Sequence, residues 1–440
     1  MKHFVEARGD ALAALQAPEI KALVEKACLI VDLRGKCRVL TRPRGGVDPG
    51  EVVQKLGELM GAAADPFWDN EMWVEGREQT SAERALYEAV WKDARPVPPG
   101  QEETFVLDRR LSKDAWLGAP LQPPWPQIAQ TPPIASFYSF KGGVGRTTAL
   151  VALAVNLARA GRRVAVIDFD LEAPGAGSLL LPAEAMRSSL GVVDYLLERP
   201  VLPAGALDIT EFYRPCDDHR IIGDGEPIFV VPSGVVDAWY IEKLARLNYE
   251  YLYRSATEDN APQSPLHDLF RSLRNSVQPE VFLVDSRAGF HDLGGLSLSG
   301  IAHLQVLFGL SSSQSWEGLS LAVSHLGKDM VLSGGQQRTC MMVHAMVSPR
   351  GKPREEEIRA FKERSFQVFS DNYYDAPDIA EAEWPVPDPE STDSPHFPFV
   401  LTRDDKISGY TSPADVAEFL CEGEYRGLAN AILARVGRGL

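Results

Sequence analysis

Apolar residues after position 133 fall into short unbroken runs, and the segments between these runs repeat apolar residues every three to four positions. An unbroken run is typical of a strand buried on both faces of a parallel sheet, whereas the second spacing predicts a helix. Residues 134–440 are therefore expected to form an α/β domain around a doubly wound, mostly parallel sheet. The clearest runs are 134–138, 164–167, 281–284, 301–310 and 339–347.

The first 118 residues show a different pattern, in which strand and helix signals are short and mixed. We expect residues 1–118 to form a smaller α+β domain, in which Asp48 and Ser81 cap two helices. No grouping of residues in it points to catalysis, so a regulatory or partner-docking role is expected. Its predicted elements are helices over 4–26, 49–59 and 81–91, a hairpin of 28–33 with 37–41, and strands over 71–74 and 104–108.

Six prolines lie between Pro120 and Pro133. Chain that is this rich in proline is stiff and extended, and it does not form a helix. Residues 119–133 are therefore predicted to be a linker between the domain of residues 1–118 and the domain of residues 134–440.

A glycine-rich turn follows the first apolar run and opens a predicted helix. In this context, glycines let backbone N–H groups converge on an anion, and the helix adds its positive end. A phosphate-binding loop also needs a cation for the β/γ-phosphates and a hydroxyl for a metal ion. Arg146 stands at the cation position, Thr147 at the metal-side hydroxyl, Thr148 offers a second hydroxyl and Lys141 a second cation. The amides are those of Gly142, Gly143, Val144 and Gly145.

Carboxylates follow two further apolar runs. Asp168 and Asp170 end one run, and side chains at i and i+2 on a strand point to the same side. Asp285 ends another run of four apolar residues, a pattern typical of a strand that delivers a carboxylate to a magnesium ion. Because parallel strands end at the edge where such sheets bind ligands, we expect these groups to meet the phosphate loop. The alternative for Asp168 is that it only caps the next turn.

The turn resembles the deviant Walker A loop of the ParA/MinD family, Lys-Gly-Gly-x-Gly-Lys-Thr-Thr, and is most similar to a variant branch that reads KGGVGR. The resemblance implies ATP and Mg²⁺ as cofactors and a homodimer formed on ATP binding, in which Lys141 reaches the partner's nucleotide. It implies that Asp170 orients the attacking water, that Asp168 supports the metal, and that Gly289 approaches the γ-phosphate. It also implies that Pro398 lies near the base.

The same resemblance implies a slow ATPase that switches a protein effector, bound through the N-terminal domain. The variant branch is often associated with bacterial conflict systems. Ser348 stands where the family commonly has asparagine near the base, so the sequence leaves ATP against GTP open. Arg287 stands where the family has proline, and it is expected either to reach phosphate or the opposing subunit, or to form a surface or interface ion pair.

Arg146 replaces the family's loop lysine. A planar guanidinium is not equivalent to a compact ammonium at a tight phosphate site. The alternative function is therefore a scaffold or sensor that binds nucleotide without hydrolysing it. A second alternative, an ABC-type ATPase, rests on Leu332–Arg338 (LSGGQQR); this stretch follows Asp285 instead of preceding it, so we interpret it as a turn.

The composition of the chain restricts the partners, metal sites and location that we expect. A net charge of −16 over 440 residues does not favour nucleic acid or a DNA-segregation motor. The five cysteines are far apart, which speaks against a disulfide scaffold or a cysteine-bound metal. Without a signal pattern or a long apolar run, the expected location is the cytoplasm. The last helix, over 423–436, has a core-packing pattern, which is favoured over membrane binding.

Overall fold

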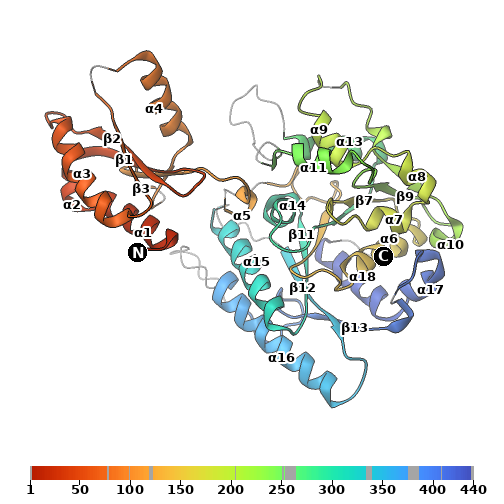
Figure 1. Cartoon of the computed structure of the whole chain (residues 1–440). Coiled ribbons are helices and arrows are strands. Elements are labelled where there is room, and N and C mark those ends of the chain that lie inside the picture. Colours follow the sequence, from red (N-terminus) through yellow and green to blue (C-terminus); the bar gives the residue numbers. More distant parts are fainter. Residues whose placement is uncertain are drawn as a thin grey trace. The chain divides into compact units, whose positions relative to one another are not determined.

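The computed structural model divides the chain into two compact units, Met1–Leu111 and Ser112–Leu440 (Figure 1). The boundary thus lies earlier than the predicted linker of residues 119–133. Trp125, within that stretch, is buried in the second unit and donates its Nε1–H to the Pro132 carbonyl at 2.8 Å. The structure describes residues 2–76, 79–98, 100–117, 122–203, 205–249, 252, 264–332, 339–374, 386–407 and 409–437.

The first unit is a five-stranded sheet with helices, as the α+β prediction required. Its strand order is β3-β2-β1-β5-β4, and the predicted hairpin is the antiparallel pair β1–β2. Two local predictions were wrong. The helix expected over 4–26 breaks at Pro18 and gives way to a strand at Val24, and the N-cap of α4 is Thr80 instead of Ser81. The elements are α1 (Phe4–Leu15), α2 (Pro18–Leu23), β1 (Val24–Val31), β2 (Cys37–Pro43), α3 (Pro49–Ala64), β3 (Trp68–Val74), α4 (Ser81–Asp93), β4 (Arg95–Pro96) and β5 (Thr104–Asp108).

The second unit is built on an eight-stranded sheet of order β13-β12-β11-β6-β10-β7-β9-β8. Neighbouring strands are parallel except at the β8–β9 edge, so the predicted doubly wound parallel sheet is confirmed. The strands are β6 (Ile134–Ser139), β7 (Val164–Asp168), β8 (Arg214–Cys216), β9 (Ile228–Val231), β10 (Val281–Asp285), β11 (Leu304–Gly309), β12 (Thr339–Val347) and β13 (Phe399–Thr402).

Helices cover both faces of this sheet (Figure 1). Along β6, Ala135 and Phe137 face a core that contains α6 and α18, whereas Ile134 and Tyr138 face the opposite cores. On the first face lie α6 (Arg146–Arg159), α7 (Ala176–Leu180), α17 (Ala417–Leu420) and α18 (Gly423–Arg435); on the second lie α9 (Val192–Glu198), α11 (Tyr240–Arg246), α13 (Pro265–Val277), α14 (Asp292–Leu296), α15 (Ser313–Leu332) and α16 (Lys352–Phe369).

Several segments differ from the sequence predictions. The long helix expected over 238–255 ends at Arg246, because Leu247 takes an extended conformation. Helix α13 and edge strand β8 were not predicted. The last helix packs its apolar face into the core as expected, and no helix in the described part of the chain is long and apolar enough to cross a membrane. The residues 333–338 of the LSGGQQR stretch lie outside the described residues.

A buried histidine makes the second unit sensitive to acid. His344 on β12 is fully buried, and its ring stacks on Phe361 with centroids 3.8 Å apart. Burial lowers the pKa of His344 to about 4, and nearby Glu357 opposes this only in part. In an unfolded chain the pKa is about 6.5. The folded state therefore resists protonation, and stability present above about pH 6.5 is lost as the pH falls towards 4.

We expect His344→Phe to reduce this loss, because the variant keeps a stacked ring but does not titrate. The free energy of unfolding, measured with urea at pH 7 and at pH 5, should fall less in the variant than in the wild type. His219→Phe, which removes an exposed histidine, is the control. An equally steep fall in the His344 variant would contradict the assignment.

Candidate functional site

The phosphate loop joins β6 to α6 in a conformation that depends on glycine. Gly143 and Gly145 have φ angles of +72° and +80°, a region that side chains rarely adopt. A Cβ placed on Gly142 or Gly143 would meet no atom within 4 Å, so the backbone there faces open space. The predicted loop thus has an accessible run of amides directly before α6.

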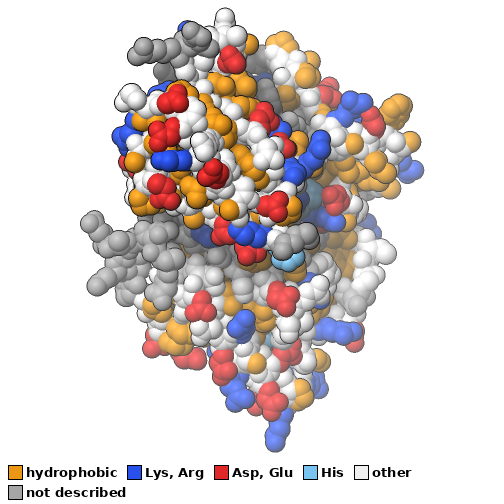
Figure 2. Space-filling model, turned by 60° about the vertical axis from the view of Figure 1, so that its left-hand side comes forward, with side chains coloured by type: hydrophobic (Ala, Val, Ile, Leu, Met, Phe, Trp, Pro, Cys, Tyr) orange, Lys and Arg blue, Asp and Glu red, His pale blue; other side chains and the backbone are white. Residues whose placement is uncertain are grey.

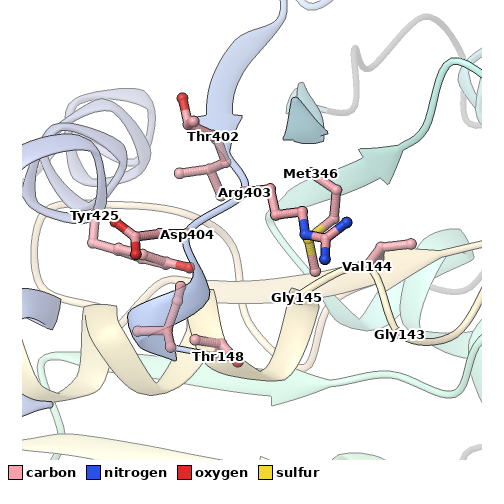
Figure 3. Close-up of a pocket in the computed structure, with 11 residues that line it drawn as sticks. Gly143, Val144, Gly145, Thr148, Met346, Thr402, Arg403, Asp404 and Tyr425 are labelled. Carbon is pink, nitrogen blue, oxygen red and sulfur yellow. The ribbon is translucent and has the colours of Figure 1, made fainter. Parts of the chain in front are cut away.

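A pocket of about 370 Å³ lies beside this loop (Figure 3). Its other wall comes from β12, β13 and the chain after β13, because parallel strands end at the same edge. Pro398, which is expected near the base, precedes β13 and is not among the lining residues of this pocket. The lining residues are Gly143, Val144, Gly145, Thr148, Met346, Leu401, Thr402, Arg403, Asp404, Ile407 and Tyr425.

Met346 holds an unusual backbone conformation at this pocket. Its φ is +57°, and the β12–β13 pairing is irregular between His344 and Val347. A bulge of this kind redirects a side chain, and the left-handed conformation is costly for a residue with a long side chain. Met346 and Arg403 both line the pocket (Figure 3), and the end of the Met346 side chain lies beside the loop, 3.7 Å from where a Cβ on Gly145 would be.

The Arg146 guanidinium turns inwards, and its side chain is 8% exposed. Its Nε–H donates to Asp285 Oδ1 at 2.7 Å, and Nη2 donates to Asp170 Oδ2 at 3.0 Å. Nη1 approaches Ser139 Oγ at 3.5 Å. One arginine therefore joins the carboxyl ends of β7 and β10 to the start of α6. The structure brings together Arg146, Asp170 and Asp285 as predicted. The charge of the arginine, however, is paired with these two carboxylates.

Thr147 and Asp285 also meet. The Thr147 hydroxyl donates to Asp285 Oδ2 at 2.7 Å, while Arg146 occupies the other oxygen. Burial raises the pKa of the Asp285 carboxyl, and the charge and hydrogen bonds of Arg146 and Thr147 lower it. In the described part of the chain, no group of three or more His, Cys, Asp or Glu side chains is arranged to hold a metal by itself. A hydroxyl and one carboxylate remain the available pair for a hydrated magnesium ion.

Asp168 is fully buried and holds the loop that follows β7. Its oxygens accept hydrogen bonds from the backbone N–H groups of Asp170, Gly175 and Gly177, at 3.2, 3.0 and 3.1 Å. Burial and the charge of Asp285 raise the pKa of Asp168 to about 7. This is the loop-capping alternative that the sequence had left open, and it leaves Asp168 a supporting place beside the site.

Asp170 lies between two arginines. Oδ2 accepts from Arg146, and Oδ1 accepts from Arg287 Nη1 at 3.0 Å. Arg287 continues to Glu172 at 3.0 Å, and Glu172 lies 2.9 Å from His291. Arg287 thus forms an ion pair within the chain, one of the two roles expected for it.

The two remaining predicted groups differ in their engagement. Gly289 has a φ of +75°, and its N–H already donates to the Ser139 carbonyl at 3.1 Å. Lys141 is half-buried at the start of the loop, and its ammonium makes no ion pair with the residues that the structure describes.

Sequence reasoning missed Met346, Arg403, Asp404 and Tyr425. Their only signal was their position near the carboxyl ends of strands or on the last helix.

We expect Arg146→Met to destabilise the protein by about 3–5 kcal/mol, because it leaves two buried carboxylates without their cation. Arg146→Lys should destabilise the protein less than Arg146→Met, because lysine keeps the charge. It should still be less stable than the wild type, because lysine cannot bridge both carboxylates. The free energy of unfolding in urea measures both.

Arg163→Met is the matched control, because Arg163 pairs with Glu226 at 3.5 Å while both side chains are about 40% exposed. Such a pair contributes about 0–1 kcal/mol. A similar loss in the Arg146→Met and Arg163→Met variants would contradict the role given to the buried arginine.

A known family model matches the part of the chain that holds the loop. Residues 135–186 match the family model of the CobQ/CobB/MinD/ParA nucleotide-binding domain. This segment holds β6, the loop, α6, β7 and both Asp168 and Asp170. No curated protein sequence matches the chain.

Solved structures that resemble the chain do so weakly. The pNOB8 ParA structure is 16% identical, with 70% of this chain and 99% of that one covered and a TM-score of 0.45. Cobyrinic acid a,c-diamide synthase from Mycobacterium smegmatis, with bound ATP analogue and magnesium, is 17% identical over 70% and 98%, with a TM-score of 0.43. The cell division ATPase MinD from Pyrococcus furiosus is 19% identical over 51% and 76%, with a TM-score of 0.34.

The family-model match confirms the resemblance expected from the loop. It covers the loop, Asp168 and Asp170, whereas Asp285 and Gly289 lie outside it. Residues 135–186 are thus similar to the nucleotide-binding domain of the CobQ/CobB/MinD/ParA family.

Proposed function

We propose that the protein is a Mg²⁺-dependent ATP-binding switch with slow hydrolytic activity. The observation that carries this proposal is the open backbone at Gly142 and Gly143, together with a pocket of nucleotide size lined by Gly143 and Gly145 and the hydroxyl–carboxylate pair of Thr147 and Asp285. Phosphate oxygens bind well to such converging amides at a helix N-terminus. The residues present therefore fit a nucleoside triphosphate.

Thr147 and Asp285 are the residues that would hold the magnesium ion. When bound, Mg²⁺ neutralises charge on the phosphate oxygens. The Thr147 hydroxyl now donates to Asp285, so a hydroxyl and a carboxylate already stand together without a large rearrangement. Asp168 supports the site from behind by holding the loop that carries Asp170.

Asp170 is proposed to orient the attacking water, and Arg146 to meet developing charge on phosphate. Both are now engaged with each other at 3.0 Å. A guanidinium that approaches phosphate must give up some of its contact with carboxylates, and this competition is a physical reason for slow turnover. Lys141, which makes no ion pair with the described residues, is proposed to reach the nucleotide of a second copy in a homodimer.

The second candidate function is a scaffold or sensor that binds nucleotide without hydrolysing it. It is favoured by the same paired guanidinium, because a cation fully used by Asp170 and Asp285 does not help the leaving phosphate. In either case we propose a protein effector that docks on the N-terminal unit, in a bacterial conflict system.

Nucleic acid is not favoured as a partner. The net charge is −16, and acidic and basic side chains are interspersed over the face shown in Figure 2. Binding to phosphate backbones needs a concentrated basic surface. We also propose, from the sequence, that the protein acts in a bacterial conflict system and in the cytoplasm.

The function is tested with the full chain, by direct measurement of Mg-ATP binding and of phosphate release. We expect binding and slow release, and Asp170→Asn should lower the release rate by about 100-fold or more while it retains binding and prolongs the dimer. Glu172→Gln, which removes a charge nearby, is the control.

Three outcomes separate the candidates. Binding without release in the wild type would favour the scaffold. Unchanged release in Asp170→Asn would remove the role given to Asp170, and absence of binding would overturn both functions.

We further propose that the base lies in this pocket, against Met346 and Arg403 (Figure 3). Arg403→Ala should weaken binding of ATP roughly two- to five-fold, the range for an exposed guanidinium over an aromatic ring. Lys406→Ala removes the same charge from the same loop, but Lys406 does not line the pocket. Equal weakening by both substitutions, measured by equilibrium dialysis, would mean that only net charge matters.

A further inference from the structure

Helix α5 (Asp114–Leu117) is the first helix of the second unit and begins three residues after the boundary at Leu111. It packs against α14, which lies in the segment that follows Asp285. The peptide that leaves the first unit is therefore fastened close to the candidate nucleotide site. All contacts described below lie within the second unit.

Three polar contacts hold this connection. The Lys113 ammonium lies 2.9 Å from Asp292 Oδ2, and the Lys113 backbone N–H donates to Oδ1 of the same carboxylate. The Asp292 side chain is 3% exposed and that of Lys113 is 42% exposed, so the carboxylate is buried while the ammonium reaches solvent. Trp116 Nε1–H donates to the His291 carbonyl at 2.8 Å. Both acceptors belong to residues that directly follow Phe290.

An aromatic chain continues from α5 to the phosphate loop. Trp116 meets Phe290 edge to face with ring centroids 5.1 Å apart, and Phe290 meets Phe140 at 5.0 Å. Phe140 directly precedes Lys141 in the chain. Three rings thus join the connection between the units to the first residue of the loop.

The aromatic rings of this series are tightly packed against their neighbours. A Cβ on Gly295 would lie 2.7 Å from Trp116 Nε1, and a Cβ on Gly318 would lie 1.9 Å from the Phe140 ring. Because packed interiors deform little, displacement of one ring requires its neighbours to move.

The backbone hydrogen bonds of Gly289 give the reason why the segment 289–292 would move on nucleotide binding. Its N–H donates to the Ser139 carbonyl, and its own carbonyl accepts from the Tyr138 hydroxyl at 3.2 Å. If this N–H is to donate to a phosphate oxygen, it must leave Ser139. Phe290, the next residue, then leaves its place between Phe140 and Trp116.

We propose that Lys113 and Trp116 couple the nucleotide site to the N-terminal unit: nucleotide binding displaces the segment 289–292, and α5 is released from it. The proposal rests on the proposed nucleotide-binding function and adds its regulatory output. The contacts of Lys113 with Asp292 stabilise the nucleotide-free arrangement. By reciprocity, anything that weakens them tightens nucleotide binding.

The first test is hydrogen exchange of the full chain, with and without a non-hydrolysable ATP analogue and Mg²⁺. Exchange over 112–117 and 289–296 should become faster when the analogue is bound. Binding of the analogue with unchanged or slower exchange over 112–117 would overturn the coupling and leave the proposed function standing. Failure of the wild type to bind the analogue would overturn the function itself.

The second test measures affinity for the same analogue. Lys113→Ala should tighten binding by about five-fold or more, the lower range of allosteric coupling. Lys243→Ala is the matched control, because Lys243 also pairs with a buried carboxylate, Asp194, at 2.7 Å. A residue with a merely structural role would weaken binding or leave it unchanged, so either result for Lys113→Ala overturns the proposal. Equal tightening in both variants does so as well.

Discussion

The ion pairs of Arg146 with Asp285 and Asp170 are the interaction on which the second unit's ligand edge depends. Three aspartates end two neighbouring strands there, and all are nearly or fully buried. Buried carboxylates that lack a partner are costly, because desolvation of a charge exceeds most other single terms in folding. The guanidinium meets two of them at once, and the backbone amides of the β7 loop meet the third.

The same interaction shapes what the site does. A lysine at position 146 would carry one mobile charge, whereas arginine carries a rigid fork that suits two carboxylates. In the arrangement described, that fork joins the ends of two strands through Asp170 and Asp285. Under the proposed function, phosphate and carboxylate compete for this one cation. This competition connects both candidate functions, since its outcome decides between a slow ATPase and a nucleotide-bound scaffold.

The segment after Asp285 connects the candidate site to the chain that enters from the first unit. Gly289 is tied to the end of β6, and the residues that follow it are held by Lys113 and Trp116 of the chain entering from the first unit. In the proposed coupling, these contacts within the second unit carry the effect of nucleotide towards the chain that leads to the N-terminal unit.

Local patterns in the sequence determined the elements and the loop. Unbroken apolar runs predict buried parallel strands wherever they occur, and glycines 143 and 145 take left-handed conformations because few other residues can. The order of the loop, Asp170 and Asp285 along strands of one parallel sheet was enough to place them together. These inferences depend on interactions between residues close in sequence, or on the rule that parallel strands end at one edge.

Tertiary structure alone decided the remainder. Whether Arg146 faces phosphate or carboxylate depends on neighbours 24 and 139 positions away. The pocket wall that includes Met346 and Arg403 depends on a bulge in β12 and on which strand lies beside it. The docking of α5 joins Lys113 to Asp292 across 179 positions. No local pattern contains such pairings, because they arise only when the sheet order brings distant segments together.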